Sequence, residues 1–241
     1  MNDGSKRRRG FTLIELLVVL AILGLVIAFF LPAVRSAREP ARRMQCQSNL
    51  RQIGLALHNY HDTYQTLPPA YTVDENGKPL HSWRTLILPY MEQAPLYNRL
   101  DLSKPWDDPV NAEAFKTVVA GYHCPSDAGP ADRTNYLAIV TDHSCLRPAA
   151  SVTLKGIKDG PSKTLIVIEV DASHAVPWME PRDANVEVAL SFLVKGKDSH
   201  TGGVHALLAD GAVRFLSETI EANVVHGLLT IDGSESICDE F

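Results

Sequence analysis

Histidine and carboxylate side chains gather in the last third of the sequence, where they are the first candidates for chemistry. Such groups are zinc ligands and the general acids and bases of hydrolases. Structural roles explain them as well: His200 precedes a Thr-Gly-Gly turn, and Asp210-Gly211 is typical of a hairpin. We therefore expect no catalytic residue and no bound metal among the five candidates, which are Glu169, Asp171, His200, His205 and Asp210.

The four cysteines, Cys46, Cys124, Cys145 and Cys238, have no CxxC spacing. This argues against a zinc knuckle and against a thioredoxin-type redox motif. In an exported domain an even number of cysteines favours disulfides, here with three connectivities, and four buried thiols are the alternative. Our first expectation is a Cys46–Cys124 bond, because Cys46 falls on the apolar stripe of a predicted helix.

Residues 16–34 read LLVVLAILGLVIAFFLPAV and contain no charged side chain. As a helix they would span ~28 Å, about the thickness of a hydrocarbon core. A core helix of a soluble protein would show one polar face. A secretory signal peptide is the alternative, but its apolar region is shorter, and a small-residue cleavage site rather than several arginines should follow it. The pattern therefore predicts a transmembrane helix.

Glu15 lies inside this apolar stretch, five residues after Gly10. A carboxylate within a membrane costs a few kcal/mol and indicates a function with a charged partner, unless it sits at the headgroup boundary. The residues RGFTLIELLVV, from Arg9 to Val19, resemble the class III prepilin signal. That signal belongs to type IV pilins and to the pseudopilins of type II secretion.

This resemblance implies that a prepilin peptidase cuts between Gly10 and Phe11 and methylates the new Phe11 amine. It also implies that Glu15 faces the Phe11 ammonium of a neighbouring subunit, which relieves two charges that are costly in lipid. Basic residues flank the apolar run on both sides, so charge alone does not orient it. The resemblance places a cytoplasmic N-terminus, one pass through the inner membrane, and a periplasmic or extracellular C-terminal domain.

The remaining elements follow from periodicity and turn residues. An apolar stripe extends the first predicted helix beyond the uncharged run at 16–34. The whole helix would then reach about fifty residues and ~75 Å. Ser82 and Asp108 are predicted to cap short helices. Predicted strands cover 135–141, 164–170, 186–193, 204–209 and 212–216, and a last helix covers 222–229. The Asp210-Gly211 pair suits a two-residue type I′ hairpin. The stripe consists of Cys46, Leu50, Ile53, Leu57 and Tyr60.

Together these elements predict an α+β fold, with the long N-terminal helix packed on an antiparallel β-sheet with short helices. We expect four parts: a basic leader at 1–10 that is cleaved, a transmembrane or fibre-core helix at 11–34, its amphipathic continuation at 35–62, and an exported globular domain at 63–241. The net charge is −5, and without residues 1–10 it becomes −8. Neither value indicates nucleic-acid binding.

Short motifs spread along the chain resemble a pilin-like family that is abundant in planctomycetes and largely of unknown function. The match extends over roughly residues 10–231 and ends with His200, nine further residues and Asp210-Gly211. The other matching segments are QCQSNL at 45–50, IGLALHNYH at 53–61, LPP at 67–69, SWR at 82–84, LPY at 88–90, EQ at 92–93, CPSD at 124–127, TNY at 134–136 and VRF at 213–215.

Three functions compete. The first is a structural pilin or pseudopilin subunit whose partners are the prepilin peptidase, other subunits and the inner membrane. The second is an exported module that binds a solute, glycan or protein and uses the leader only as an anchor. An exported hydrolase is the third and weakest. We expect no enzyme activity and no cofactor. Calcium is an alternative, because some pseudopilins bind it in a C-terminal loop and Asp232, Asp239 and Glu240 supply oxygen ligands.

Overall fold

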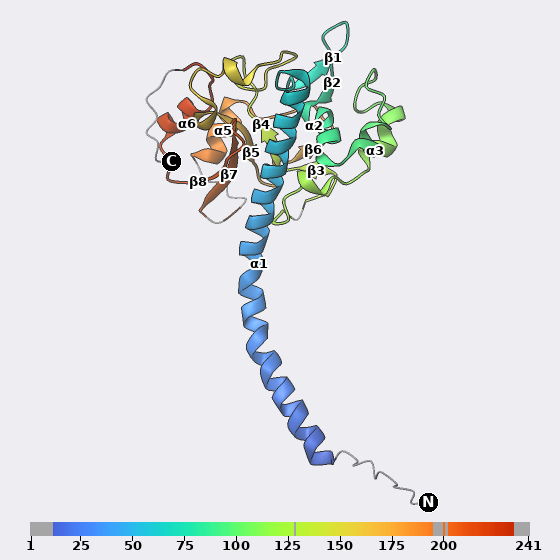
Figure 1. The fold of residues 1–241 in the computed structure, drawn as a ribbon, viewed down its shortest axis with the longest axis vertical. Coiled ribbons are helices and arrows are strands. Elements are labelled where there is room, and N and C mark those ends of the chain that lie inside the picture. Colours follow the sequence, from blue (N-terminus) through green and yellow to red (C-terminus); the bar gives the residue numbers. More distant parts are fainter. Residues whose placement is uncertain (1–11, 128, 195–199, 201, 234–241) are drawn as a thin grey trace, which may run out of the picture. The chain divides into compact units, whose positions relative to one another are not determined.

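The structure is a computed structural model that describes residues 12–127, 129–194, 200 and 202–233 (Figure 1). The chain forms two compact units, residues 1–41 and residues 42–241, which are described separately below. One helix, α1 (Leu13–Tyr64), contributes residues to both units. Helices and antiparallel sheets follow it, so the predicted α+β class is confirmed.

In the first unit, α1 presents apolar side chains on all sides. Every large apolar residue described there is exposed, with fractions from 44% at Val26 to 77% at Leu13. Successive helical residues are 100° apart, so the five residues from Leu16 to Leu20 encircle the helix. In the described part of the chain, no helix reaches both the length and the apolar character that crossing a membrane requires. The transmembrane helix at 16–34 stays a prediction.

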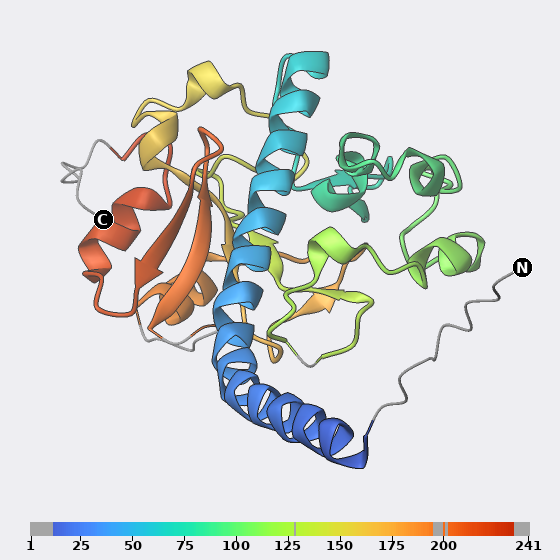
Figure 2. The ribbon, with the colours of Figure 1, turned by 60° about the horizontal axis from the view of Figure 1, so that its bottom comes forward.

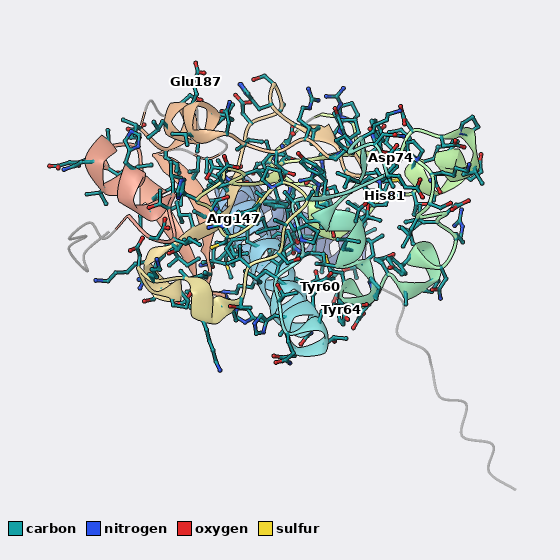
Figure 3. All side chains as sticks on the ribbon, turned by 90° about the horizontal axis from the view of Figure 1, so that it is seen from above. Tyr60, Tyr64, Asp74, His81, Arg147 and Glu187 are labelled. Atoms are coloured by element: carbon teal, nitrogen blue, oxygen red, sulfur yellow. The ribbon has the colours of Figure 1, made fainter. Side chains whose placement is uncertain are left out.

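In the second unit, α1 buries one stripe against the rest of the domain. Cys46, Leu50 and Ile53 are fully buried and Leu57 nearly so, as their spacing predicted. Residues 42–64 lie with the main sheet on one side and the segment from β1 to α3 on the other (Figure 2). Near the end of the helix, the rings of Tyr60 and Tyr64 pack with centroids 4.4 Å apart (Figure 3).

The main sheet has four antiparallel strands in the order β4-β5-β7-β8. They are β4 (Tyr136–Ala138), β5 (Leu165–Glu169), β7 (Gly203–Leu208) and β8 (Val213–Ser217). The central strands β5 and β7 are buried throughout, because both faces of the sheet are covered. One apolar cluster joins the sheet to the α1 stripe, and a second joins it to the helices α5 (Val186–Leu193) and α6 (Ala222–Leu228).

Two small antiparallel sheets and several short helices complete the domain. β1 (Tyr71–Val73) pairs with β2 (Pro79–Ser82), and β3 (Arg133–Thr134) pairs with β6 (Val176–Pro177). Ser82 and Asp108 cap short helices as predicted, each through its side-chain oxygen. The short helices are α2 (Trp83–Leu86), α3 (Ala94–Tyr97) and α4 (Ala112–Phe115), and the 3₁₀ turns are η1 (Leu88–Met91), η2 (Pro109–Asn111), η3 (Ala120–Tyr122), η4 (Leu154–Gly156) and η5 (Pro161–Lys163).

Two local predictions were wrong. Residues 186–193 form the helix α5 rather than a strand, because Asn185 caps them by accepting a hydrogen bond from the Val188 N–H. The turn at Asp210-Gly211 is not type I′, which needs positive φ at both central residues. Gly211 has φ +86°, whereas the non-glycine residues described with positive φ do not include Asp210. The Leu208 N–H donates to Ala212 O and the Gly211 N–H to Leu208 O, which fits a longer loop ending in a left-handed glycine.

Candidate functional site

Glu15 lies in the first turn of α1, where Thr12 holds its carboxylate. The Thr12 backbone N–H and hydroxyl both donate to Glu15 Oε2 at 2.8 Å, and the Glu15 N–H lies 3.3 Å from Thr12 Oγ1. This reciprocal pair is a capping box, which the Thr-x-x-Glu spacing could have revealed from the sequence. Gly10 and Phe11 lie outside the described residues, so the cleavage and the Glu15–Phe11 pairing stay predictions.

A second group of reactive side chains is buried in the unit of residues 42–241, and its members come from four separate segments. Cys46 lies on α1, Cys124 follows η3, Glu169 ends β5, and His200 precedes β7. All four residues are at most 2% exposed. One sulfur, nitrogen or oxygen atom from each lies within 4.8 Å of the corresponding atoms of the others. We call these four residues the Cys-Cys-Glu-His cluster.

Glu169 is the carboxylate of this cluster and lies between two imidazoles. Its Oε1 lies 3.2 Å from His200 Nε2, and its Oε2 lies 3.1 Å from His205 Nδ1 in a hydrogen bond. Burial acts to raise the pKa of Glu169, but the two imidazoles outweigh it and lower that pKa to about 2. The His200 and His205 rings meet edge to face, with centroids 5.2 Å apart.

The two thiols of the cluster are adjacent and are free in this structure. The Cys46 thiol and burial together raise the pKa of Cys124 far above its ordinary value. A nucleophilic cysteine needs a lowered pKa and access to substrate, whereas Cys124 is 1% exposed. This arrangement therefore does not suit a cysteine hydrolase. The Cys46–Cys124 disulfide stays a prediction, with its two sulfurs already close to each other.

The structure does not bring together the His and Asp of the C-terminal motif. His200 and Asp210 lie at opposite ends of β7, whose six residues extend ~20 Å. Asp210 shapes the turn instead: its Oδ1 accepts a hydrogen bond from the Ala212 N–H at 2.8 Å. A Cβ at Gly211 would lie 3.4 Å from His58 Nε2, so this glycine also allows α1 to approach the turn closely.

The other candidate ligands have local partners. Asp171 Oδ1 accepts hydrogen bonds from the Ser173 N–H and hydroxyl and lies 2.9 Å from His174 Nδ1. Asp232 Oδ1 lies 3.2 Å from His143 Nδ1. Asp239 and Glu240 lie outside the described residues, so the calcium alternative stays untested.

An open groove of about 460 Å³ lies on another part of the same unit. Arg133, His174 and Arg182 line it together with Ser173, Asp183 and four apolar residues. Its volume falls within the range of small-molecule sites. The groove gives the binding-module hypothesis a concrete location that the sequence did not indicate.

Comparisons with known proteins find similarity along the first two thirds of the chain. Residues 5–31 match the prokaryotic N-terminal methylation motif. Residues 35–152 match a family described as a protein of unknown function (DUF1559). No solved structure is significantly similar to the chain.

Two curated relatives are core proteins of type II secretion. The chain is 35% identical over 72 residues to type II secretion system core protein G of Klebsiella pneumoniae, which is 30% of this chain and 49% of that protein. It is 32% identical over 73 residues to core protein G of Dickeya chrysanthemi, or 30% and 45% of the two chains. The chain thus spans less than half the length of either relative.

Proposed function

From the premise that this chain is a pilin-like protein with a prokaryotic N-terminal methylation motif and a DUF1559 segment, we propose that it is a structural subunit rather than an enzyme. A prepilin peptidase removes residues 1–10 and methylates Phe11. The mature chain stays in the inner membrane or joins other pilin-like subunits through its N-terminal helix. The methylation motif, with Glu15 in register, is the observation that carries this proposal.

The exposed apolar residues of α1 support assembly through that helix. The large apolar side chains from Leu13 to Val26 are 44% to 77% exposed, and they surround the helix. A surface of this kind needs lipid or other apolar helices around it. Bundled copies would keep these side chains away from water without a bilayer, so the same segment serves as an anchor and as the core of a fibre.

Glu15 gives this assembly its register. Both hydrogen bonds from Thr12 reach Oε2. In our proposal, Oε1 accepts the Phe11 ammonium of the next subunit, so the capping box and the intersubunit pair use different oxygens of one carboxylate. A copy displaced along the helix axis would lose this pairing. It would leave two unpaired charges in an apolar bundle, which is costly.

Replacement of Glu15 with lysine tests the proposal. We expect the Glu15→Lys chain to be processed and inserted but absent from cross-linked oligomers and from sheared fibre fractions, because two cations would then face each other. Glu75→Lys, which makes the same change at an exposed position of the second unit, is the matched control and should assemble. Normal assembly of Glu15→Lys would contradict a fibre held by this pair.

The groove lined by Arg133 and Arg182 supports the second candidate, an anchored binding module. Such a receptor would keep its ligand whether or not Glu15 is replaced. Thermal-shift screening of small anions against wild type and Arg133→Ala/Arg182→Ala would test it. A ligand that stabilises wild type but not the double variant, and that Glu15→Lys still binds, would favour the receptor over the subunit.

A further inference from the structure

The geometry points to a structural zinc-type metal site formed by Cys46, Cys124, Glu169 and His200. The site would join α1 to the main sheet, because its ligands come from α1, from the loop after η3, from the end of β5 and from the entry to β7. All four ligands belong to residues 42–241. This inference is independent of whether the chain forms fibres.

The donor set suits zinc among the common metals. Two thiolates, one imidazole and one carboxylate are four single-atom ligands of the kinds that bind Zn²⁺ in tetrahedral sites. Thiolates disfavour magnesium and calcium, which prefer oxygen ligands throughout. The site has no fifth side chain in the described cluster and is buried, which is typical of structural sites with a closed coordination sphere.

The separations within the cluster match a tetrahedron around one ion. With metal–nitrogen and metal–oxygen bonds of ~2.1 Å, two tetrahedral ligands lie ~3.4 Å apart, and a sulfur and a nitrogen lie ~3.6 Å apart. His200 Nε2 lies 3.2 Å from Glu169 Oε1 and 3.9 Å from Cys124 Sγ. All four atoms fall within 4.8 Å of one another, so a small movement of side chains would complete the shell.

An unsatisfied carboxylate oxygen supplies the independent observation. Glu169 is fully buried, and its Oε1 accepts no hydrogen bond, although His200 Nε2 lies only 3.2 Å away. A buried carboxylate oxygen without a donor costs free energy that a protein normally avoids. A cation bound between the two side chains would satisfy Glu169 Oε1, and His200 Nε2 is close enough to ligate the same ion.

The surroundings orient the ligands in the way that metal sites require. His205 Nδ1 hydrogen-bonds Glu169 Oε2 and so leaves Oε1 for the ion. The Cys124 backbone N–H donates to Asn135 Oδ1 at 3.0 Å, which fixes the loop that carries the thiol. Outer partners of this kind hold metal ligands in place and change metal affinity when they are removed.

A Cys46–Cys124 disulfide is the competing use of the same sulfurs. It would consume both thiols and leave Glu169 Oε1 and His200 without the ion, so the two states exclude each other. Metal binding would release the two thiol protons, because zinc binds cysteine as the thiolate.

Metal content decides between these states. The full chain, purified in mild detergent without chelator, should contain about one equivalent of zinc by elemental analysis. Cys46→Ser and His200→Ala should lose most of that zinc. Cys145→Ser removes another fully buried cysteine that is outside the cluster, and it is the matched control that should keep the metal.

A second measurement does not depend on the variants folding. Exchange of wild-type protein with Co²⁺ should give the strong near-ultraviolet absorption of thiolate-bound cobalt, and chelation should lower the melting temperature of wild type and of Cys145→Ser. The proposal is overturned if wild type binds neither zinc nor cobalt under reducing conditions, if alkylation and mass spectrometry find Cys46 bonded to Cys124 in the native chain, or if Cys46→Ser retains stoichiometric zinc.

Discussion

Arg84 is a buried charge with several hydrogen-bond partners in the second unit. It is fully buried, and its guanidinium donates to Asp183 Oδ1 at 2.6 Å and to the backbone carbonyls of Tyr136, Trp178, Glu180 and Arg182. The preceding Trp83 donates its indole N–H to the same Asp183 oxygen. The Ser-Trp-Arg segment thus ties the β2–α2 junction to the loop around residue 180, which gives this motif a structural role.

Truncation of the Arg84 side chain should strongly destabilise the second unit. Arg84→Met leaves the Asp183 carboxylate buried without its cation, and we expect a loss of ~3–5 kcal/mol in the free energy of unfolding. The double variant Arg84→Met/Asp183→Leu should recover part of this loss, because it removes the second charge as well. Chemical denaturation measures both, with exposed Arg99→Met as the control. Equal stability of Arg84→Met and wild type would contradict this account.

His81 makes stability depend on pH. It is 1% exposed, and its Nε2 lies 2.8 Å from Lys104 O, which can only accept a hydrogen bond, so Nε2 carries a proton. Burial lowers the pKa of His81, although nearby backbone carbonyls oppose this. The unfolded chain therefore binds a proton more readily, and this stabilising contribution is present above about pH 6.5 and is lost as the pH falls toward the folded pKa.

Comparison with His81→Gln isolates that contribution, because glutamine can still donate to Lys104 O without gaining a proton. We expect the stability of wild type to fall more steeply than that of the variant between about pH 7 and about pH 5.5. Urea denaturation at each pH gives the difference in unfolding free energy between wild type and the variant. The contributions of the other histidines cancel in this difference. Parallel pH profiles would show that His81 does not titrate on unfolding.

At the scale of elements, the contact between α1 and the β7–β8 turn depends on two glycines. A Cβ at Gly54 would lie 2.8 Å from Leu207 Cδ1 and 3.5 Å from the Gly211 Cα. Gly54 on α1 and Gly211 in the turn thus allow helix and hairpin backbones to approach each other. This close approach gives a packing role to Gly54, whose motif at 53–61 had none from the sequence, and adds one to Gly211, whose predicted role was the turn alone.

A larger residue at Gly54 should separate these elements. Gly54→Val would force Leu207 and the turn outward and destabilise the domain by ~1–3 kcal/mol. Gly24→Val makes the same change in the same helix at a position with no atom within 4 Å of the added Cβ, and it should leave the unfolding of the second unit unchanged. Equal melting temperatures for the two variants would contradict the close-contact explanation.

The sequence predicted those elements whose signal is local. The α1 stripe, the caps at Ser82 and Asp108, four strands of the main sheet and α6 all follow from nearby residues. Residues 186–193 were wrongly predicted as a strand, because a short apolar run fits both a strand and a buried helix. Only the Asn185 cap decides between them. The Cys-Cys-Glu-His cluster could not be predicted, because its members lie in four distant segments and only the tertiary fold brings them together.

For the whole molecule, charge and hydrophobicity act in opposite directions on assembly. Without the leader the chain carries a net charge of −8, so neighbouring copies repel one another, more strongly at low salt. In the proposed assembly, the exposed apolar residues from Leu13 to Val26 supply the attraction. Assembly through the first helix therefore has to outweigh repulsion between acidic domains.

In the proposed subunit, cleavage after Gly10 would set that balance, because it would remove four basic residues and create the Phe11 amine. We expect the native chain to begin with N-methylated Phe11, and Gly10→Ala to retain residues 1–10, since a peptidase that recognises a residue without a side chain would reject the added Cβ. Intact-mass spectrometry of membrane-extracted protein measures both. Gly4→Ala changes the other glycine of the leader and should be processed normally. A native chain that still carries its Lys-Arg-Arg-Arg segment would leave Glu15 without the amine that the fibre requires, and only membrane anchoring would remain.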